Sequence, residues 1–292
     1  GIEHLTVDDI QLILETAQQF KEIINRPIKK VPTLRDITIA NLFFENSTRT
    51  RISFELAQKR LSADIINFSS SSSSVKKGET LLDTVNNILA MKVDVVVMRH
   101  PNPGAAVFLS KRVNSVIINA GDGKHSHPTQ ALLDLFTIYE HFNGQTEGKK
   151  IAIVGDVRNS RVAGSNRRLL PRFGIDVSLV APDCFKYENN DFKQYTNIRE
   201  IIDELDIIMS LRSQLERHNL TYFESLNEYA KDYCITNELM GDRDILLLHP
   251  GPVNRNVDIS DEMLKDPRSK VLTQVTNGVA IRAAILKKLI LK

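Results

Sequence analysis

The stretch that decides the fold of this chain is ITIANLFFENSTRTRISFE, residues 37–55. It begins with an apolar run rich in β-branched and aromatic residues, which predicts a strand over residues 37–44. Polar and charged residues follow at 45–51, and the apolar-patterned segment after them predicts a helix. Ser47 lies where the strand gives way to the helix, and serine is a preferred N-cap residue. A strand that passes directly into a helix is the repeating unit of an α/β fold.

The residues that follow Ser47 form a candidate anion site. With Ser47 as the N-cap, the backbone N–H groups of Thr48, Arg49 and Thr50 point out of the helix end. The positive end of the helix dipole lies behind them, which favours phosphate. Arg49 and Arg51 add full positive charges. An ordinary capped helix with surface arginines is the alternative that this stretch alone leaves open.

Short apolar runs of the same kind recur along the chain, with helical segments between them. The predicted strands are 37–44, 64–68, 94–98, 115–119, 151–155, 176–181, 206–210 and 245–248. Continuous apolar runs bounded by turn residues are typical of strands that are buried on both faces, as in a parallel sheet covered by helices.

A long helix predicted over residues 129–142 separates the strands into two groups. The polar, glycine-containing stretch after it predicts a domain boundary, with one domain over residues 1–143 and another over 144–276. A closing helix at about 277–292 is expected to pack back on the first domain. The fold class is therefore α/β, with two doubly wound domains that each hold a mostly parallel sheet flanked by helices.

The bulk composition excludes several classes of protein. The chain has 292 residues, 42% of them hydrophobic, and a formal net charge of only +2, which gives no reason to expect a nucleic acid or a membrane as partner. No apolar run approaches the ~18 residues of a membrane span, and no signal peptide is visible. Cys184 and Cys234 form neither a disulfide framework nor a metal-ligand pattern. We therefore expect a cytoplasmic protein.

Polar residues are concentrated where the predicted strands end. Seven strand ends carry them, and in open α/β sheets ligands bind beyond the carboxyl ends of the strands. Most are hydrogen-bond donors: Ser47, Thr48, Arg49, Thr50, Arg99, His127, Arg161, Arg212 and Gln214. Planar arginine side chains favour phosphate and carboxylate. The pattern predicts a site that holds a strongly anionic ligand and performs little covalent chemistry itself.

Motifs for cofactors and metals are absent. No G-x-G-x-x-G occurs, and the glycine-rich residues 121–125 lack the spacing of a P-loop. His125 and His127 would need further ligands to bind zinc, and none has a suitable spacing. We therefore expect neither a metal nor a cofactor. His127 precedes Pro128, so a turn histidine is the alternative for that residue alone.

A serine run occupies residues 69–74 and leads into Lys76 and Lys77. A flexible linker is the usual interpretation of such a run. Here the run follows a predicted strand and precedes a predicted helix, with two lysines after it, so we interpret it as a loop of the site.

Four motifs together resemble the aspartate/ornithine carbamoyltransferase family. They are Ser47-Thr48-Arg49-Thr50, Arg99-His100-Pro101, His127-Pro128-Thr129-Gln130 and His249-Pro250-Gly251-Pro252, in the order and at spacings that suit the family. The resemblance covers essentially the whole chain. A single motif of four residues is weak evidence, whereas the ordered set is strong.

The second half of the chain resembles the aspartate branch of this family. Thr129 and Pro250 stand where the ornithine branch typically has cysteine. Arg161 and Arg212 suit a dicarboxylate, whereas the distal cation of ornithine would need a carboxylate partner. Two alternatives stay open. One is another amino-acid acceptor, such as ornithine or an acylated ornithine, and the other is a non-catalytic relative.

The resemblance implies transfer of a carbamoyl group from carbamoyl phosphate to the amine of L-aspartate, the committed step of pyrimidine biosynthesis. Thr50, Arg99, His127 and Lys77 are the implied catalytic residues. The implied carbamoyl phosphate ligands are Ser47, Thr48, Arg49, Thr50, Arg99, His127, Gln130, Ser73 and Lys77. The implied aspartate ligands are Lys77, Arg161, Arg212, Gln214, Gly251 and Pro252.

The resemblance also implies an assembly. In this family the residues that match Ser73 and Lys77 reach into the site of the neighbouring subunit, which implies a homotrimer with shared sites. The sequence around Arg161 and after His249 is more similar to the branch that works as a trimer alone or with dihydroorotase than to the branch with regulatory chains. A dihydroorotase or regulatory chain therefore stays open as a partner.

Overall fold

The computed structural model describes most of the chain. It describes residues 1–69, 79–188, 191–213 and 225–291. Of the helices in these ranges, none combines the length and the apolar character that crossing a membrane requires.

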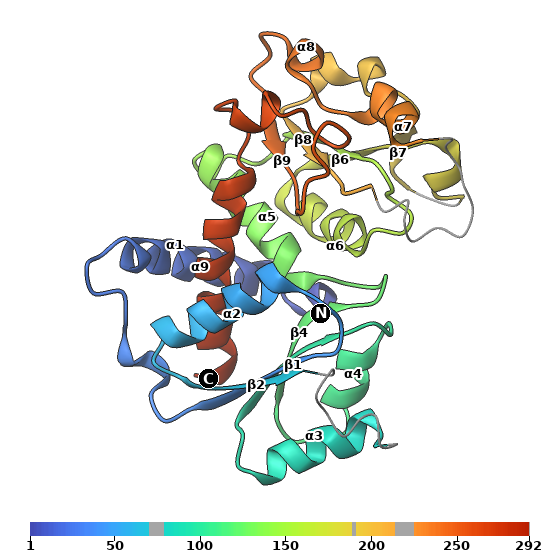
Figure 1. Ribbon diagram of the computed structural model, residues 1–292. Helices are drawn as coiled ribbons and strands as arrows, with labels where there is room; N and C mark the ends of the chain where they lie inside the picture. The colour runs from blue at the N-terminus through green and yellow to red at the C-terminus, as the bar shows by residue number, and fades with distance from the viewer. Residues whose placement is uncertain (70–78, 189–190, 214–224, 292) are drawn as a thin grey trace. The chain divides into compact units, whose positions relative to one another are not determined.

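The chain divides into two compact units. Unit 1 contains Gly1–Leu133 and Val275–Lys292, and unit 2 contains Asp134–Gln274. The chain passes between the units within two long helices, α5 (Pro128–His141) and α9 (Val271–Ile290) (Figure 1). Unit 2 is therefore an insertion between two parts of the sequence that form unit 1.

Unit 1 is built on a four-stranded parallel sheet in the order β2-β1-β3-β4. Its strands are β1 (Thr38–Phe43), β2 (Asp64–Ser69), β3 (Val95–His100) and β4 (Val116–Asp122). Its other helices are α1 (Val7–Ile24), α2 (Thr48–Arg60), α3 (Leu81–Ala90) and α4 (Ala105–Ser110), with short 3-10 turns at Ile2–His4 and Pro32–Leu34.

Helices cover both faces of this sheet (Figure 1). Ala40 and Leu42 of β1 are fully buried in one hydrophobic cluster with residues of α3 and α4. On the opposite face, Asn41 of β1 exchanges two hydrogen bonds with Gln58 of α2, at 2.9 and 2.8 Å. The alternation of side chains along β1 therefore places α2 on one face and α3 and α4 on the other.

Unit 2 is built on a five-stranded parallel sheet in the order β7-β6-β5-β8-β9. Its strands are β5 (Lys150–Val154), β6 (Asp176–Val180), β7 (Lys193–Tyr195), β8 (Ile207–Ser210) and β9 (Leu246–Leu248). Its helices are α6 (Arg161–Leu169), α7 (Leu226–Tyr233) and α8 (Asn237–Met240), with 3-10 turns at Leu170–Phe173, Asp183–Phe185, Ile198–Glu200, Ile202–Glu204 and Met263–Lys265.

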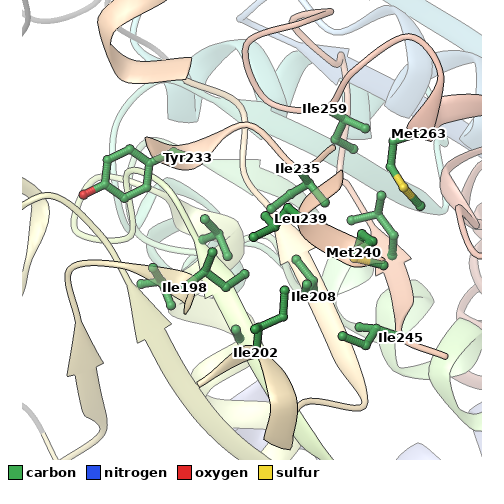
Figure 2. Packing of buried hydrophobic residues seen from close by; sticks show 14 of the residues in the cluster. Ile198, Ile202, Ile208, Tyr233, Ile235, Leu239, Met240, Ile245, Ile259 and Met263 are labelled. Atoms are coloured by element: carbon green, nitrogen blue, oxygen red, sulfur yellow. The ribbon is translucent and has the colours of Figure 1, made fainter. Parts of the chain in front are cut away.

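The core of unit 2 also lies on both sides of its sheet. Figure 2 shows Ile208 of β8 in a buried cluster with Leu239 and Met240 of α8 and with Ile198 from the 3-10 turns. The next residue along β8, Met209, faces the other way, and its sulfur lies 3.5 Å from Nδ2 of Asn166 on α6. The structure therefore confirms the predicted fold class of two parallel sheets that are each flanked by helices.

Two predictions about elements were wrong in detail. The short strand β7 was not predicted, because its three residues are polar or only partly buried at the edge of the sheet. Helix α9 begins at Val271 rather than at about residue 277. Gly278 lies inside this helix, where a Cβ would come within 2.5 Å of Arg282 Nη1 and 3.3 Å of Leu133 Cδ2, so the glycine leaves space for these side chains.

Candidate active site

The first turn of α2 is built to receive an anion. Ser47 is the N-cap in an extended conformation, and its side chain makes no capping hydrogen bond. Thr48 and Arg49 are exposed at the start of this helix of 13 residues, and Thr50 is buried. Helix N-terminal amides have no partner within the helix, so this end offers donors and the positive end of the dipole.

Arg99, at the carboxyl end of β3, is buried beside this turn. Its Nε and Nη2 both donate to Glu45 Oε1 at 2.6 Å, and its Nη1 lies 3.4 Å from Thr50 Oγ1. Nη1 also lies 3.5 Å from the carbonyl oxygen of Ala120 on β4. A guanidinium that is 8% exposed needs such partners to offset its lost hydration. Arg99 is therefore held in place before any ligand arrives.

His127 and Gln130 lie at the start of α5, and both are buried. The backbone N–H of Gln130 donates to the carbonyl of His127 at 3.1 Å, so the two residues share the first turn. Ser126, just before His127, pairs with Asp122 at the end of β4, which neighbours β3. The turn that presents His127 is therefore attached to the strand end next to Arg99.

The carboxylate of Asp122 holds that turn together. It is fully buried and accepts from the backbone N–H of Gly104 at 2.8 Å and from Nδ2 of Asn119 at 3.1 Å. Its Oδ2 also lies 3.0 Å from Nδ1 of His125. Nearby, burial lowers the pKa of His100 below its usual value, although the charge of Glu45 opposes this. The lowered pKa favours the neutral form of His100, and Arg99 supplies positive charge on β3.

In unit 2, Arg161 occupies the first position of α6. Ser160 is the N-cap, and its Oγ accepts from the backbone N–H of Ala163 at 3.2 Å. The buried carboxylate of Asp156 accepts from the backbone N–H and from Nδ2 of Asn159, at 3.1 and 3.0 Å. These bonds fix the loop between β5 and α6, so the base of the half-buried Arg161 is well defined.

The loops after β8 and β9 are joined by one buried carboxylate. Asp258 Oδ1 accepts from the backbone N–H and from Oγ of Ser213, at 3.0 and 2.9 Å. Its Oδ2 accepts from the backbone N–H of Asn254 at 2.8 Å and lies 3.1 Å from His249 Nε2. Ser213 follows Arg212 directly, so Asp258 holds the backbone that carries Arg212 to the loop that begins at His249.

The ring of His249 adopts one tautomer in this network. The backbone N–H of Gly251 donates to His249 Nδ1 at 2.8 Å, so Nδ1 must be an acceptor. Nε2 therefore carries the proton and donates it to Asp258. The ring and the Gly251 amide together position the Gly251–Pro252 segment, whose peptide bond is cis.

Two kinds of chemistry find no support in the described residues. No group of three or more His, Cys, Asp and Glu side chains there could hold a metal ion. Burial raises the pKa of Cys184 above its usual value and that of Cys234 to about 11. A thiol with a raised pKa is a poor nucleophile at neutral pH.

The structure thus brings several predicted residues together within each unit. In unit 1 these are Ser47, Thr48, Arg49, Thr50, Arg99, His127 and Gln130. In unit 2, Arg161, Arg212, Gly251 and Pro252 all follow strand ends of the second sheet. Ser73, Lys77 and Gln214 lie outside the described residues.

Sequence reasoning did not identify Glu45 or Asp258. Glu45 lies inside the stretch that first suggested an anion site, and an acid among so many donors was a usable signal. Asp258 contacts Ser213 across 45 positions of sequence, and no local pattern predicts such a contact.

Comparison with known families places both halves of the chain. Residues 1–140 match the model of the aspartate/ornithine carbamoyltransferase, carbamoyl-P binding domain. Residues 147–289 match the aspartate/ornithine carbamoyltransferase, Asp/Orn binding domain.

Individual relatives agree with these matches. The aspartate carbamoyltransferase catalytic subunit of Aliarcobacter butzleri is 70% identical over 98% of this chain and 95% of its own length. The catalytic subunit of M. jannaschii aspartate transcarbamoylase has a TM-score of 0.87 at 34% identity, over 99% of this chain and 96% of that one. Aspartate transcarbamoylase of Trypanosoma cruzi in complex with N-(phosphonacetyl)-L-aspartic acid has a TM-score of 0.90 at 32% identity, over 99% and 94%. The chain belongs to the aspartate/ornithine carbamoyltransferase family.

Proposed function

We infer that this chain transfers the carbamoyl group of carbamoyl phosphate to the amine of L-aspartate, giving N-carbamoyl-L-aspartate and phosphate. This reaction is the committed step of pyrimidine biosynthesis. The observation that carries the inference is the buried Arg99, held beside the first turn of α2 with Thr50 at 3.4 Å. The aspartate carbamoyltransferase name of a relative that is 70% identical supports aspartate as the acceptor.

In unit 1 the proposed ligand is carbamoyl phosphate. The amides and hydroxyls of Ser47, Thr48 and Thr50, together with Arg49, bind the phosphate at the start of α2. Arg99 reaches from the phosphate to the carbonyl oxygen. In the neighbouring turn, His127 donates to the same carbonyl oxygen, and Gln130 binds the carbamoyl nitrogen. Ser73 and Lys77 complete this proposed set.

In unit 2 the proposed ligand is L-aspartate. Arg161, at the start of α6, binds the α-carboxylate, and Arg212 binds the side-chain carboxylate together with Gln214. Backbone around Gly251 and Pro252 contacts the amine, and Lys77 is shared between the two substrates. Two arginines are matched to two carboxylates, which favours aspartate over a cationic acceptor.

The proposed chemistry relies on donors and orientation. The amine attacks the carbonyl carbon and forms a C–N bond while negative charge develops on the carbonyl oxygen. Thr50, Arg99 and His127 stabilise that charge, and one such donor is typically worth about 10²–10³ in rate. The C–O bond to phosphate then breaks, and we propose that the departing phosphate takes the proton of the amine. Holding two anionic substrates in register adds a proximity contribution.

We expect the purified protein to form carbamoylated product with aspartate and not with ornithine. The measurement is product formed from carbamoyl phosphate, with the two acceptors tested side by side at equal concentration. Turnover with ornithine would overturn the assignment of Arg161 and Arg212, and an acylated ornithine is tested next if neither acceptor is used. Absence of turnover with every acceptor, in folded protein, would favour a non-catalytic relative.

We also propose a homotrimer in which Lys77 acts in the site of the neighbouring subunit. Lys77→Ala and Arg49→Ala chains should each be inactive alone, because each lacks a cation for the phosphate. Mixing the two chains should restore part of the activity, because some hybrid sites then contain both side chains. The check is the activity of the mixture after dissociation and reassociation; a mixture as inactive as its components contradicts shared sites.

The family resemblance also leaves a dihydroorotase or a regulatory chain open as a partner of the proposed trimer. A cytoplasmic location is proposed on the chemistry of Cys184 and Cys234, which are both free thiols.

A further inference from the structure

A chain of buried hydrogen bonds starts at Asp134 on α5. One oxygen of this fully buried carboxylate accepts from Asn166 Nδ2 on α6 at 2.9 Å, and the other accepts from Gln274 Nε2 on α9 at 2.8 Å. Gln274 Oε1 in turn accepts from the backbone N–H of His249 at 2.9 Å. One carboxylate therefore ties three helices to the end of β9.

The series of hydrogen bonds continues from the loop after β9 to the loop after β8. His249 Nε2 lies 3.1 Å from Asp258, and Asp258 binds Ser213 beside Arg212. All of these links are buried. Within unit 2, the described elements that carry proposed aspartate ligands are therefore attached to the same network: α6 with Arg161, the loop after β8 with Arg212, and the loop after β9.

We propose that Asp134 and Gln274 are positioning residues for the second substrate, because their buried hydrogen bonds hold α6 and the loops after β8 and β9 where these elements bind aspartate. The proposal rests on the proposed function for its ligand. It adds residues that do not touch the substrate and lie at the two ends of unit 2, where the chain enters from Leu133 and leaves to Val275.

The physical reason is that the hydrogen bonds of Asp134 to Asn166 and Gln274, and of Gln274 to His249, are all buried. A buried polar group that loses its partner bears the full cost of its lost hydration, so the structure moves to restore a bond. The backbone beside Arg212 and Gly251 is held through these bonds, so a changed network displaces it. A displacement of about 1 Å in a substrate-positioning group costs on the order of 10²-fold in rate.

The test begins with Gln274→Glu, which keeps the size of the side chain. It replaces the amide donor with a second carboxylate beside Asp134, and two buried carboxylates at this distance repel. We expect the KM for aspartate to rise by about 10²-fold while the KM for carbamoyl phosphate stays within about twofold. If Gln274→Glu does not fold, Gln274→Met removes the same hydrogen bonds without adding charge.

Adding Asp134→Asn to Gln274→Glu should restore the wild-type KM. The exchange leaves one carboxylate and one amide, so Asn166, His249 and the exchanged pair can all keep their hydrogen bonds. Rescue shows that the two side chains act as a pair, and the unchanged KM for carbamoyl phosphate in Gln274→Glu separates positioning from a general structural defect.

Thr146→Val is the matched control. Thr146 is buried in unit 2, and its Oγ1 donates to the carbonyl of Phe173 at 2.8 Å, away from the network. It should lower the melting temperature without changing either KM. If wild-type enzyme uses aspartate and Gln274→Glu keeps the wild-type KM, or raises both KM values equally, the positioning role is wrong. If wild-type enzyme does not use aspartate at all, the proposed function itself fails.

Discussion

Replacing Arg99 with alanine is expected to lower kcat by at least about 10³-fold and to raise the KM for carbamoyl phosphate. The variant loses a donor to the carbonyl oxygen and a charge beside the phosphate. It also leaves the Glu45 carboxylate, which Arg99 contacts at 2.6 Å, facing an anionic ligand. Steady-state kinetics with each substrate varied in turn would measure both effects.

A second substitution separates the two causes. In Arg99→Ala/Glu45→Gln the repulsive charge is gone, so the KM for carbamoyl phosphate should recover in part while kcat stays low. Arg268→Ala is the control for loss of a paired arginine, because Arg268 binds Asp266 at 2.8 Å and two backbone carbonyls within unit 2. It should change stability and leave kcat near the wild-type value. A kcat for Arg99→Ala within tenfold of wild type would falsify the role of Arg99.

The fold could be predicted from the sequence because its signals are local. A strand buried on both faces must be a continuous apolar run, and the carboxyl ends of parallel strands meet at one edge of the sheet. The predicted strands and the strand-end donors such as Arg99, Arg161 and Arg212 follow from these two facts, whereas Gln130, Gly251 and Pro252 were implied only by the family resemblance. Strand β7 was not predicted because Lys193, Gln194 and Tyr195 lie at the edge of the sheet, where a strand need not be apolar. The start of α9 was placed about six residues too late, because the sequence does not show that Gly278 lies inside the helix beside Arg282.

The supporting residues could not be predicted because their partners are distant in sequence. Asp134 and Gln274 are 140 positions apart and still share a hydrogen bond. Nothing in the residues around either one indicates the other. A candidate ligand-binding arginine, in contrast, can be recognised from its position directly after a predicted strand. The sequence therefore offers candidate ligand-binding side chains and leaves open which residues hold them in place.

Arg161 and Arg212, the two arginines proposed to bind aspartate, should have different effects on substrate discrimination when each is replaced by alanine. Either change should raise the KM for aspartate by about 10²–10³-fold, because truncating one partner of a buried charge pair costs roughly 2–5 kcal/mol. They differ in what they do to discrimination. Arg212 is proposed to bind the side-chain carboxylate, so Arg212→Ala should bring kcat/KM for aspartate down toward the value for asparagine. Arg161 is proposed to bind the α-carboxylate, which both amino acids possess, so Arg161→Ala should lower both values by a similar factor and keep their ratio.

The decisive measurement is the ratio of kcat/KM for aspartate to that for asparagine in wild type and in each variant. The ratio cancels losses of folded protein and any general disturbance of the site, since both substrates experience them equally. A collapse of the ratio in Arg161→Ala rather than in Arg212→Ala would exchange the two roles. An unchanged ratio in both variants would mean that neither arginine binds the side-chain carboxylate. Gln214 would then have to bind it. The loop of Arg212 is fixed by Asp258 through Ser213, at 3.0 Å from the backbone N–H, so a discriminating Arg212 requires that this backbone stay in place.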